Sequence, residues 1–169
     1  MKSLGALQSL AFRAKGPRNV DIFDAVFEKR RAEFRIAPLT PDGEVAYRSW
    51  RVMPTAEEEE AIKQRILDCK ADPEREDLLT RLIAGEQKGV ISEEIMSPAF
   101  IVASRQAWPM HIQMNQRLEK FVSLRFLHVD VRGWDVYYAT YENGHSIWSA
   151  GPLTTDHKLA GVLTRWFSA

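Results

Sequence analysis

Residues 4–12 read LGALQSLAF and residues 118–126 read LEKFVSLRF, and the two stretches align without a gap at a shift of 114 residues. The same shift aligns a PLTxD block at residues 38–42 with one at residues 152–156. It also matches single positions, among them Asp21 with Asp135, Glu28 with Glu142, Phe23 with Tyr137, Phe34 with Trp148 and Arg51 with Arg165. A chance match would not keep one register over about fifty residues. We interpret the stretches as copies of one structural unit.

The second copy has the residue types of β-structure. Residues 126–131 and 134–142 are rich in β-branched and aromatic side chains, which favour strands. Alternation along the second of these strands places Tyr137, Ala139 and Tyr141 on one face. Because this face carries the aromatic positions that recur in both copies, we expect it to face the core.

A hairpin turn is predicted at Asn143-Gly144, since a type I′ turn needs positive φ angles that these residues tolerate. A two-residue loop there would pair Glu142 with His145. The first copy has Lys29-Arg30 at the matching position. We therefore expect its hairpin to use a different or looser turn.

Three helix N-termini are predicted between the copies. Thr55 and Glu58 form a capping box, and Asp72-Pro73 and Ser97-Pro98 each place a capping residue before a proline. The apolar positions at helical spacing are Ile62, Ile66 and Cys69 in the first helix, Leu78, Leu79, Leu82 and Ile83 in the second, and Phe100, Val102, Ala103 and Ala107 in the third. We expect Cys69 and the four positions of the second helix to be buried.

The ends of these helices are marked less clearly. Gly85 or Gly89 is expected to end the second helix, and Pro109 to kink the third. Residues 55–169 are therefore predicted to be a complete α+β unit, with helices over 55–117 and three or four mostly antiparallel strands over 118–169. Residues 1–54 hold only the strand half, whose apolar face would be open. The second unit, another chain or sequence outside this chain would have to cover it.

Composition excludes several classes of protein. The chain has 169 residues, 23 basic and 23 acidic side chains, 45% apolar residues and one cysteine. This charge balance argues against nucleic-acid binding, and one cysteine excludes an internal disulfide or a cysteine-rich zinc site. No apolar run approaches the ~18 residues of a membrane span, and the N-terminus makes a poor signal peptide. We expect a cytoplasmic protein without a cofactor.

The stretches MSPAFIVASRQ, LEKFVSLRF, GWDVYYATYENG and W-x-x-x-PLTxD, in this order, form a recognisable series. The series resembles the nuclear transport factor 2-like (ketosteroid isomerase-like) domains found with bacterial serine hydrolases. The resemblance implies helices packed on a curved sheet (a cystatin-like cone fold) around a cone-shaped pocket, a homodimer, and a serine hydrolase as partner. His157 departs from the family pattern, which has a glycine after Asp156; the first copy keeps Gly43 there.

Acid–base chemistry is the enzymatic option in such a cone, where burial shifts a pKa toward neutrality. His128, Tyr138 and Asp130 are the catalytic candidates, although His128 and Asp130 also suit a solvated strand edge. Asp135 and Tyr137 recur in the first copy as Asp21 and Phe23, so we interpret both as structural, with Asp135 fixing the turn at Gly133. Ser146 lacks the G-x-S-x-G elbow, and the histidines lack metal-ligand spacing.

Four apolar side chains are candidates for a ligand pocket: Trp108, Met110, Met114 and Trp148. Ligand pockets are mostly apolar with few polar groups, so tryptophan and methionine suit them. The same residue types are equally typical of a plain core. Both interpretations stay open for these residues.

Charge is unevenly distributed along the chain. Residues 1–54 carry ten basic and six acidic side chains, and residues 55–117 carry eight and twelve. The basic cluster Lys29-Arg30-Arg31 lies at a predicted hairpin tip. Phosphate binding at this tip is one interpretation, but attraction between the basic strands and the acidic helices explains the asymmetry more simply.

Two functions are compatible with these patterns. The first is a non-catalytic module that associates through a sheet face and binds a small apolar ligand in its cone. The alternative is a small enzyme, an isomerase or dehydratase, that uses His128, Tyr138 or Asp130 as acid or base.

Overall fold

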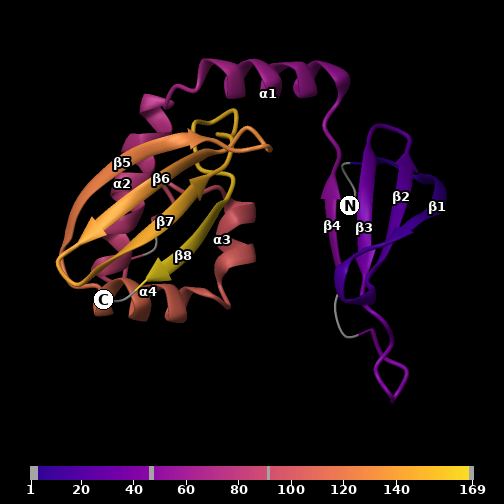
Figure 1. The fold of residues 1–169 in the computed structure, drawn as a ribbon, viewed down its shortest axis with the longest axis horizontal. Helices are drawn as coiled ribbons and strands as arrows, with labels where there is room; N and C mark the ends of the chain where they lie inside the picture. The colour runs from indigo at the N-terminus through magenta and orange to yellow at the C-terminus, as the bar shows by residue number, and fades with distance from the viewer. Residues whose placement is uncertain (1–3, 46–47, 91, 168–169) are drawn as a thin grey trace. The chain divides into compact units, whose positions relative to one another are not determined.

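A computed structural model describes residues 4–45, 48–90 and 92–167 of the chain (Figure 1). The fold is α+β, with two four-stranded antiparallel sheets of order β1-β2-β3-β4 and β5-β6-β7-β8. The chain divides into two compact units, Met1–Glu60 (unit 1) and Ala61–Ala169 (unit 2). The division falls inside helix α1 (Ala56–Asp68), later than the predicted boundary at residue 55.

Unit 1 is built from strands. Its strands are β1 (Leu7–Lys15), β2 (Asp21–Phe27), β3 (Arg31–Ile36) and β4 (Arg48–Val52), with a short 3-10 turn, η2 (Pro17–Asn19), between the first two. Its buried apolar cluster consists of Leu4, Ala25, Phe27 and Ala32. Larger apolar side chains on the same face stay exposed, including Leu10 (53%) and Phe12 (57%). The predicted open apolar face is therefore present.

Unit 2 packs helices against one face of its sheet. The helices are α2 (Pro73–Gln87), α3 (Pro98–Ser104) and α4 (Trp108–Arg117), and the strands are β5 (Phe121–Val129), β6 (Asp135–Tyr141), β7 (Gly144–Ala150) and β8 (Val162–Phe167). Tyr137, Ala139 and Tyr141 face these helices and are buried, as the alternation predicted. Figure 1 shows the curved sheet lying across α2, α3 and α4.

The pairing of the first sheet recurs in the second at a constant shift of 114 residues. Leu10 pairs with Ala25 and Leu124 with Ala139, and every other pair of the first sheet has its counterpart. The register shifts recur as well, between Leu7 and Ser9 and between Phe12 and Ala14 in β1, and between Phe121 and Ser123 and between Phe126 and His128 in β5. The sequence alignment therefore describes corresponding positions in two sheets.

Two turns that lie 114 residues apart from their counterparts also have matching backbone φ angles. Gly43 has φ 83° and its counterpart His157 has φ 57°, both in the left-handed region. Asn19 and its counterpart Gly133 share that region with φ 61° and 75°. The turn of the PLTxD block thus keeps its shape where histidine replaces glycine, although a side chain is strained in this conformation.

The predicted hairpin register in unit 2 is wrong by two residues. Tyr141 pairs with Gly144, so Glu142 and Asn143 form the loop, and Glu142 does not pair with His145. Backbone N–H groups of the loop donate to carbonyls of the segment before β5, Glu142 to Lys120 and Asn143 to Leu118, each over 3.0 Å. These tertiary hydrogen bonds hold the loop one residue earlier than Asn143-Gly144 alone would favour.

The first hairpin uses the same loop position, and its turn is looser, as expected, because Arg30 lies outside both strands whereas its counterpart Gly144 begins β7. Phe27 N–H donates to the Arg30 carbonyl over 2.9 Å, which leaves Glu28 and Lys29 in the loop. The Glu28 and Lys29 N–H groups again donate to the segment before the first strand. A shared tertiary contact, and not a shared pair of turn residues, sets both hairpins.

The predicted helix starts are confirmed. Thr55 and Glu58 exchange capping hydrogen bonds of 2.8 and 3.2 Å, and the Asp72 and Ser97 side chains accept from the first turns of α2 and α3. The stripe Leu78, Leu79, Leu82 and Ile83 is buried. Of the two glycines, Gly89 follows the helix end with φ 71°.

Two helix predictions are wrong. Cys69 is exposed with φ 45°, because α1 ends at Asp68, and none of the residues 56–68, all of which the structure describes, is buried. Residues 98–117 form two helices separated at residues 105–107, so Pro109 lies in the first turn of α4 and does not kink a longer helix. In the described residues, no helix is both long and apolar enough to cross a membrane.

Candidate functional site

None of the three predicted acid–base residues lines the pocket that the structure shows in unit 2. His128 is exposed on β5. Tyr138 lies on the outer face of the second sheet, where its ring stacks on His145 at 5.0 Å. Asp130 accepts the Arg132 backbone N–H over 2.8 Å and also forms an ion pair with the Arg132 guanidinium. The structure therefore does not bring these three residues together.

Asp135 connects the sheet of unit 2 to its helices. Its carboxylate is fully buried and forms an ion pair with Arg65, accepts the Asp72 backbone N–H over 2.9 Å, and lies 3.5 Å from the Arg75 guanidinium. The predicted role in the turn at Gly133 is wrong, because Asp130 supplies those side-chain bonds.

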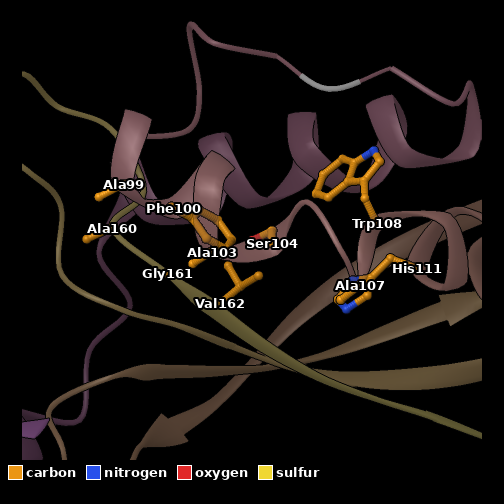
Figure 2. Close-up of a pocket in the computed structure, with 10 residues that line it drawn as sticks. All are labelled: Ala99, Phe100, Ala103, Ser104, Ala107, Trp108, His111, Ala160, Gly161 and Val162. Carbon is orange, nitrogen blue, oxygen red and sulfur yellow. The ribbon is translucent and has the colours of Figure 1, made fainter. Parts of the chain in front are cut away.

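A pocket opens between α3, α4 and the start of β8 in unit 2. Its volume is about 380 Å³, and its lining residues are Ala99, Phe100, Ala103, Ser104, Ala107, Trp108, His111, Ala160, Gly161 and Val162. Figure 2 shows the α3 and α4 residues on one side and Val162 of β8 on the other. Alanine and glycine keep much of the wall small, which is why space remains between the helices and the strand.

One of the four predicted ligand residues belongs to this pocket. Trp108 lines it and is itself 6% exposed. Met110 is exposed on α4, and Met114 is half-buried on the same helix. Trp148 is fully buried in the core, where its indole Nε1–H donates to Ser146 over 2.7 Å.

His111 is the one titratable side chain among the lining residues of this pocket. Its ring is parallel to the Trp108 ring at 6.3 Å and stands edge-on to the Trp166 ring at 4.7 Å. Its Nδ1 lies 3.5 Å from Oε1 of Glu86, a fully buried carboxylate on α2. The imidazole is therefore held between two indoles and next to an acid.

Burial raises the pKa of Glu86 above its ordinary value, and His111 and Asn115 oppose this shift only in part. The Asn115 amide donates to Glu86, and its oxygen accepts the Tyr141 hydroxyl over 3.0 Å. This chain of polar side chains continues from Tyr141 to Ser146. The carboxyl group thus sits in an apolar interior and is connected to the sheet through hydrogen bonds.

Several buried polar atoms around His111 lack a hydrogen-bond partner among the described residues. They are Nε1 of Trp108 and Nε1 of Trp166, while Oε1 of Glu86 and Nδ1 of His111 lie 3.5 Å from each other without the geometry of a hydrogen bond. Buried polar groups are normally satisfied, and an unsatisfied one costs stability. Of these residues, Trp108 and His111 line the pocket, and the His111 imidazole, whose side chain is 18% exposed, is the polar ring that a bound molecule can reach.

The sequence contained one usable signal for this site. Glu86 lies four residues after Leu82 and seven after Leu79, so it continues the buried stripe of α2 as a carboxylate. A carboxylate at an apolar position of a helix is rarely buried without a partner. The position of His111 opposite Glu86 depends on how α4 packs, and no spacing in the sequence indicates it.

No group of three or more potential metal ligands gathers within the parts of the chain that the structure describes. Comparisons with models of protein families, with curated proteins and with solved structures found no match.

Proposed function

We propose that unit 2 binds a small, mainly apolar molecule with one hydrogen-bonding group in the pocket between α3, α4 and β8. The observation that carries this proposal is the position of His111, between two indoles and 3.5 Å from the buried Glu86 carboxylate, in a pocket whose other lining residues are apolar apart from Ser104. A volume of about 380 Å³ lies within the usual range for small-molecule sites.

The chemistry of the polar end supports a ligand with a hydroxyl, carbonyl or similar head group. A neutral imidazole carries one donor nitrogen and one acceptor nitrogen, so the His111 ring can donate to a head group or accept from it. A hydroxyl head group, which both donates and accepts, matches either form of this ring. An apolar body would then lie against Phe100 and Val162.

The finer description of the fold is part of the same proposal. We infer that unit 2 is a cone-fold domain of the nuclear transport factor 2-like kind and that unit 1 is a duplicate of its strand half. The constant shift of 114 residues in strand pairing supports duplication. Helices on the inner face of a curved antiparallel sheet, with a pocket beside them, support the cone.

Binding of 1-naphthol, which has an apolar body and one hydroxyl group, tests the site by isothermal titration calorimetry. Ala103 lines the pocket, so Ala103→Phe should fill it and weaken binding about tenfold or more. The neighbouring Val102 is 72% exposed and does not line the pocket, so Val102→Phe is the matched control and should bind as wild type does. Equal affinities in the two variants would refute the site.

The polar end is tested separately with naphthalene, which lacks the hydroxyl group. Wild type should prefer 1-naphthol to naphthalene, and His111→Phe should reduce this preference about fivefold, the effect of one hydrogen bond. An unchanged preference in this variant would show that the ligand does not reach His111. The pocket would then be a purely apolar site.

An acid–base enzyme is the second candidate, and the raised pKa of Glu86 beside His111 favours it. A carboxylate in an apolar interior is a stronger base than in water. We would test it by exchange of the α-protons of 2-tetralone in D₂O, followed by NMR. A catalytic base should accelerate exchange, and Glu86→Gln should then reduce the rate at least ~100-fold. Exchange at the rate of buffer alone would leave binding as the function.

A further inference from the structure

The first sheet carries an apolar face that no element among the described residues of unit 1 covers. Leu10, Phe12 and Trp50 on this face are 53%, 57% and 47% exposed. The Phe12 ring contacts Phe23 edge-on at 5.7 Å, and Phe34 stacks on Trp50 at 6.3 Å. A contiguous aromatic patch of this kind on one face of a sheet usually marks an interaction site.

The corresponding face of the second sheet is covered by helices. Phe126 is the counterpart of Phe12 and makes the same edge-on ring contact, at 5.7 Å to Tyr137. There, Phe126 packs against a core to which α2 contributes Leu78 and Leu82. Because the strand pairing is the same in both sheets, the two faces offer the same arrangement of positions to a helix.

Each of the two faces has a carboxylate at its edge, which can bind a basic side chain of a helix that packs on the face. In unit 2, Asp135 is bound by Arg65, by Arg75 and by the Asp72 backbone N–H at the start of α2. In unit 1, its counterpart Asp21 has Lys15 Nζ at 3.5 Å. The Asp21 Oδ1 atom is buried and has no hydrogen-bond partner within the described parts of the chain. The Asp21 side chain is thus 40% exposed with one lysine nearby, whereas Asp135 is fully buried and bound by two arginines and a backbone N–H.

We propose that this face of unit 1, with Leu10, Phe12 and Trp50 at its centre and Asp21 at its edge, docks an amphipathic α-helix of a partner protein. The helix carries an apolar stripe at i, i+3, i+4 and i+7 and an arginine near its N-terminus that binds Asp21. The companion sheet favours a helix over a second copy of the sheet, since helices cover the matching face and supply the arginines for the matching carboxylate.

A synthetic peptide of residues 70–90 of this chain is the probe, because it contains α2 with Arg75, Leu78 and Leu82. The labelled peptide is titrated with the full-length protein and followed by fluorescence anisotropy. Saturable binding is expected. Phe12→Lys should weaken it about 30-fold, the effect of losing an interface hot spot. Leu163→Lys, at an apolar position on β8 that is 51% exposed, is the matched control and should leave binding unchanged.

A charge exchange tests the contact with Asp21. The peptide with Arg75→Asp should bind the wild-type protein about tenfold more weakly, and Asp21→Arg in the protein should restore binding of this peptide. Circular dichroism verifies that each variant is folded.

Three results would overturn the proposal. The first is a wild-type protein that does not bind the peptide saturably. The second is binding that Phe12→Lys leaves intact. The third is self-association of the chain that Phe12→Lys abolishes, because the occupant of the face would then be a second copy.

Discussion

The sheets β1–β4 and β5–β8 share their strand pairing, their register shifts and the left-handed residue of the PLTxD turn. They differ in what lies on one face. In unit 2 this face is buried under α2, α3 and α4, and Asp135 binds two arginines. In unit 1 the matching face keeps Phe12 57% exposed, and Asp21 has no such partners.

This difference shows that the pairing of the strands and the covering of the apolar sheet face by helices are determined separately. Pairing follows from alternation and from hydrogen bonds between each hairpin loop and the segment before the first strand. Covering the apolar face requires a helix with a complementary apolar stripe, such as the stripe of α2. A sheet can therefore keep its register while its apolar face remains available for another partner.

The largest expected effect comes from removing the carboxylate at the matched position of each sheet. Asp135→Asn leaves Arg65 and Arg75 without their buried partner and should lower the free energy of unfolding by about 3–5 kcal/mol. Asp21→Asn changes a half-exposed pair with Lys15 and should cost less than ~1 kcal/mol.

Urea unfolding followed by tryptophan fluorescence measures each loss in its own unit. Four of the five tryptophans lie in unit 2, so Trp50→Phe makes the signal specific for that unit and for Asp135→Asn. The difference from the signal of the protein that keeps Trp50 reports unit 1 and Asp21→Asn. Equal losses in the two variants would show that the matched carboxylates have the same surroundings in solution.

The second largest effect is on the pH dependence of stability in unit 1, where Glu33 stands at the position that matches the apolar Ile147 of unit 2. Burial alone would raise the pKa of Glu33, but hydrogen bonds from Arg13, Arg35 and Arg51 lower it to about 2. Since this value lies below the ordinary 4.5, the carboxylate contributes stability that is complete above about pH 5 and is lost as the pH falls toward 2.

Glu33→Gln should therefore lower stability near neutral pH by about 2 kcal/mol and flatten its decrease in acid. Trp50 fluorescence reports unit 1, because Trp50 is the only tryptophan of residues 1–60. Glu44→Gln, at an exposed acid of the same unit, is the control and should keep the wild-type pH profile. An unchanged acid dependence in Glu33→Gln would disprove the role of the three arginines.

The smallest effect is expected at the left-handed position of the PLTxD turn. His157→Gly should relieve backbone strain at φ 57° and raise stability by about 0.5–1 kcal/mol. The exposed contact of His157 with Glu74 offsets little of this gain. Gly43→Ala introduces the same strain at φ 83° and should lower stability by about 1 kcal/mol. Thermal unfolding measures both changes, and midpoint temperatures that shift in the same direction in the two variants would contradict the predicted opposite effects.

The candidate site was predictable only in part. Trp108 was identified among the apolar candidates and lines the pocket. His111 and Glu86 were missed as a pair, because they come from α4 and α2 and meet only when these helices pack. His128, Tyr138 and Asp130 were selected from single strands, where alternation assigns a face but does not show whether that face encloses a cavity.

Local interactions are what the sequence alone determined in this chain. The helix starts at Thr55, Asp72 and Ser97 were predictable because a capping side chain bonds to a backbone N–H only two or three residues away. The 114-residue correspondence was visible for a similar reason, since the face of a strand on which a side chain lies follows from its position among its neighbours in the chain.

Only the tertiary structure decided the contacts between distant segments. Each hairpin loop lies one residue earlier than the turn residues predict, because backbone N–H groups of the loop donate to carbonyls of the segment before the first strand of that sheet. Asp135 binds arginines of α1 and α2, and Glu86 meets His111, through helix packing. The physical reason is range: a cap or a strand face depends on neighbours in the chain, whereas the partner of a buried charge depends on which elements pack together.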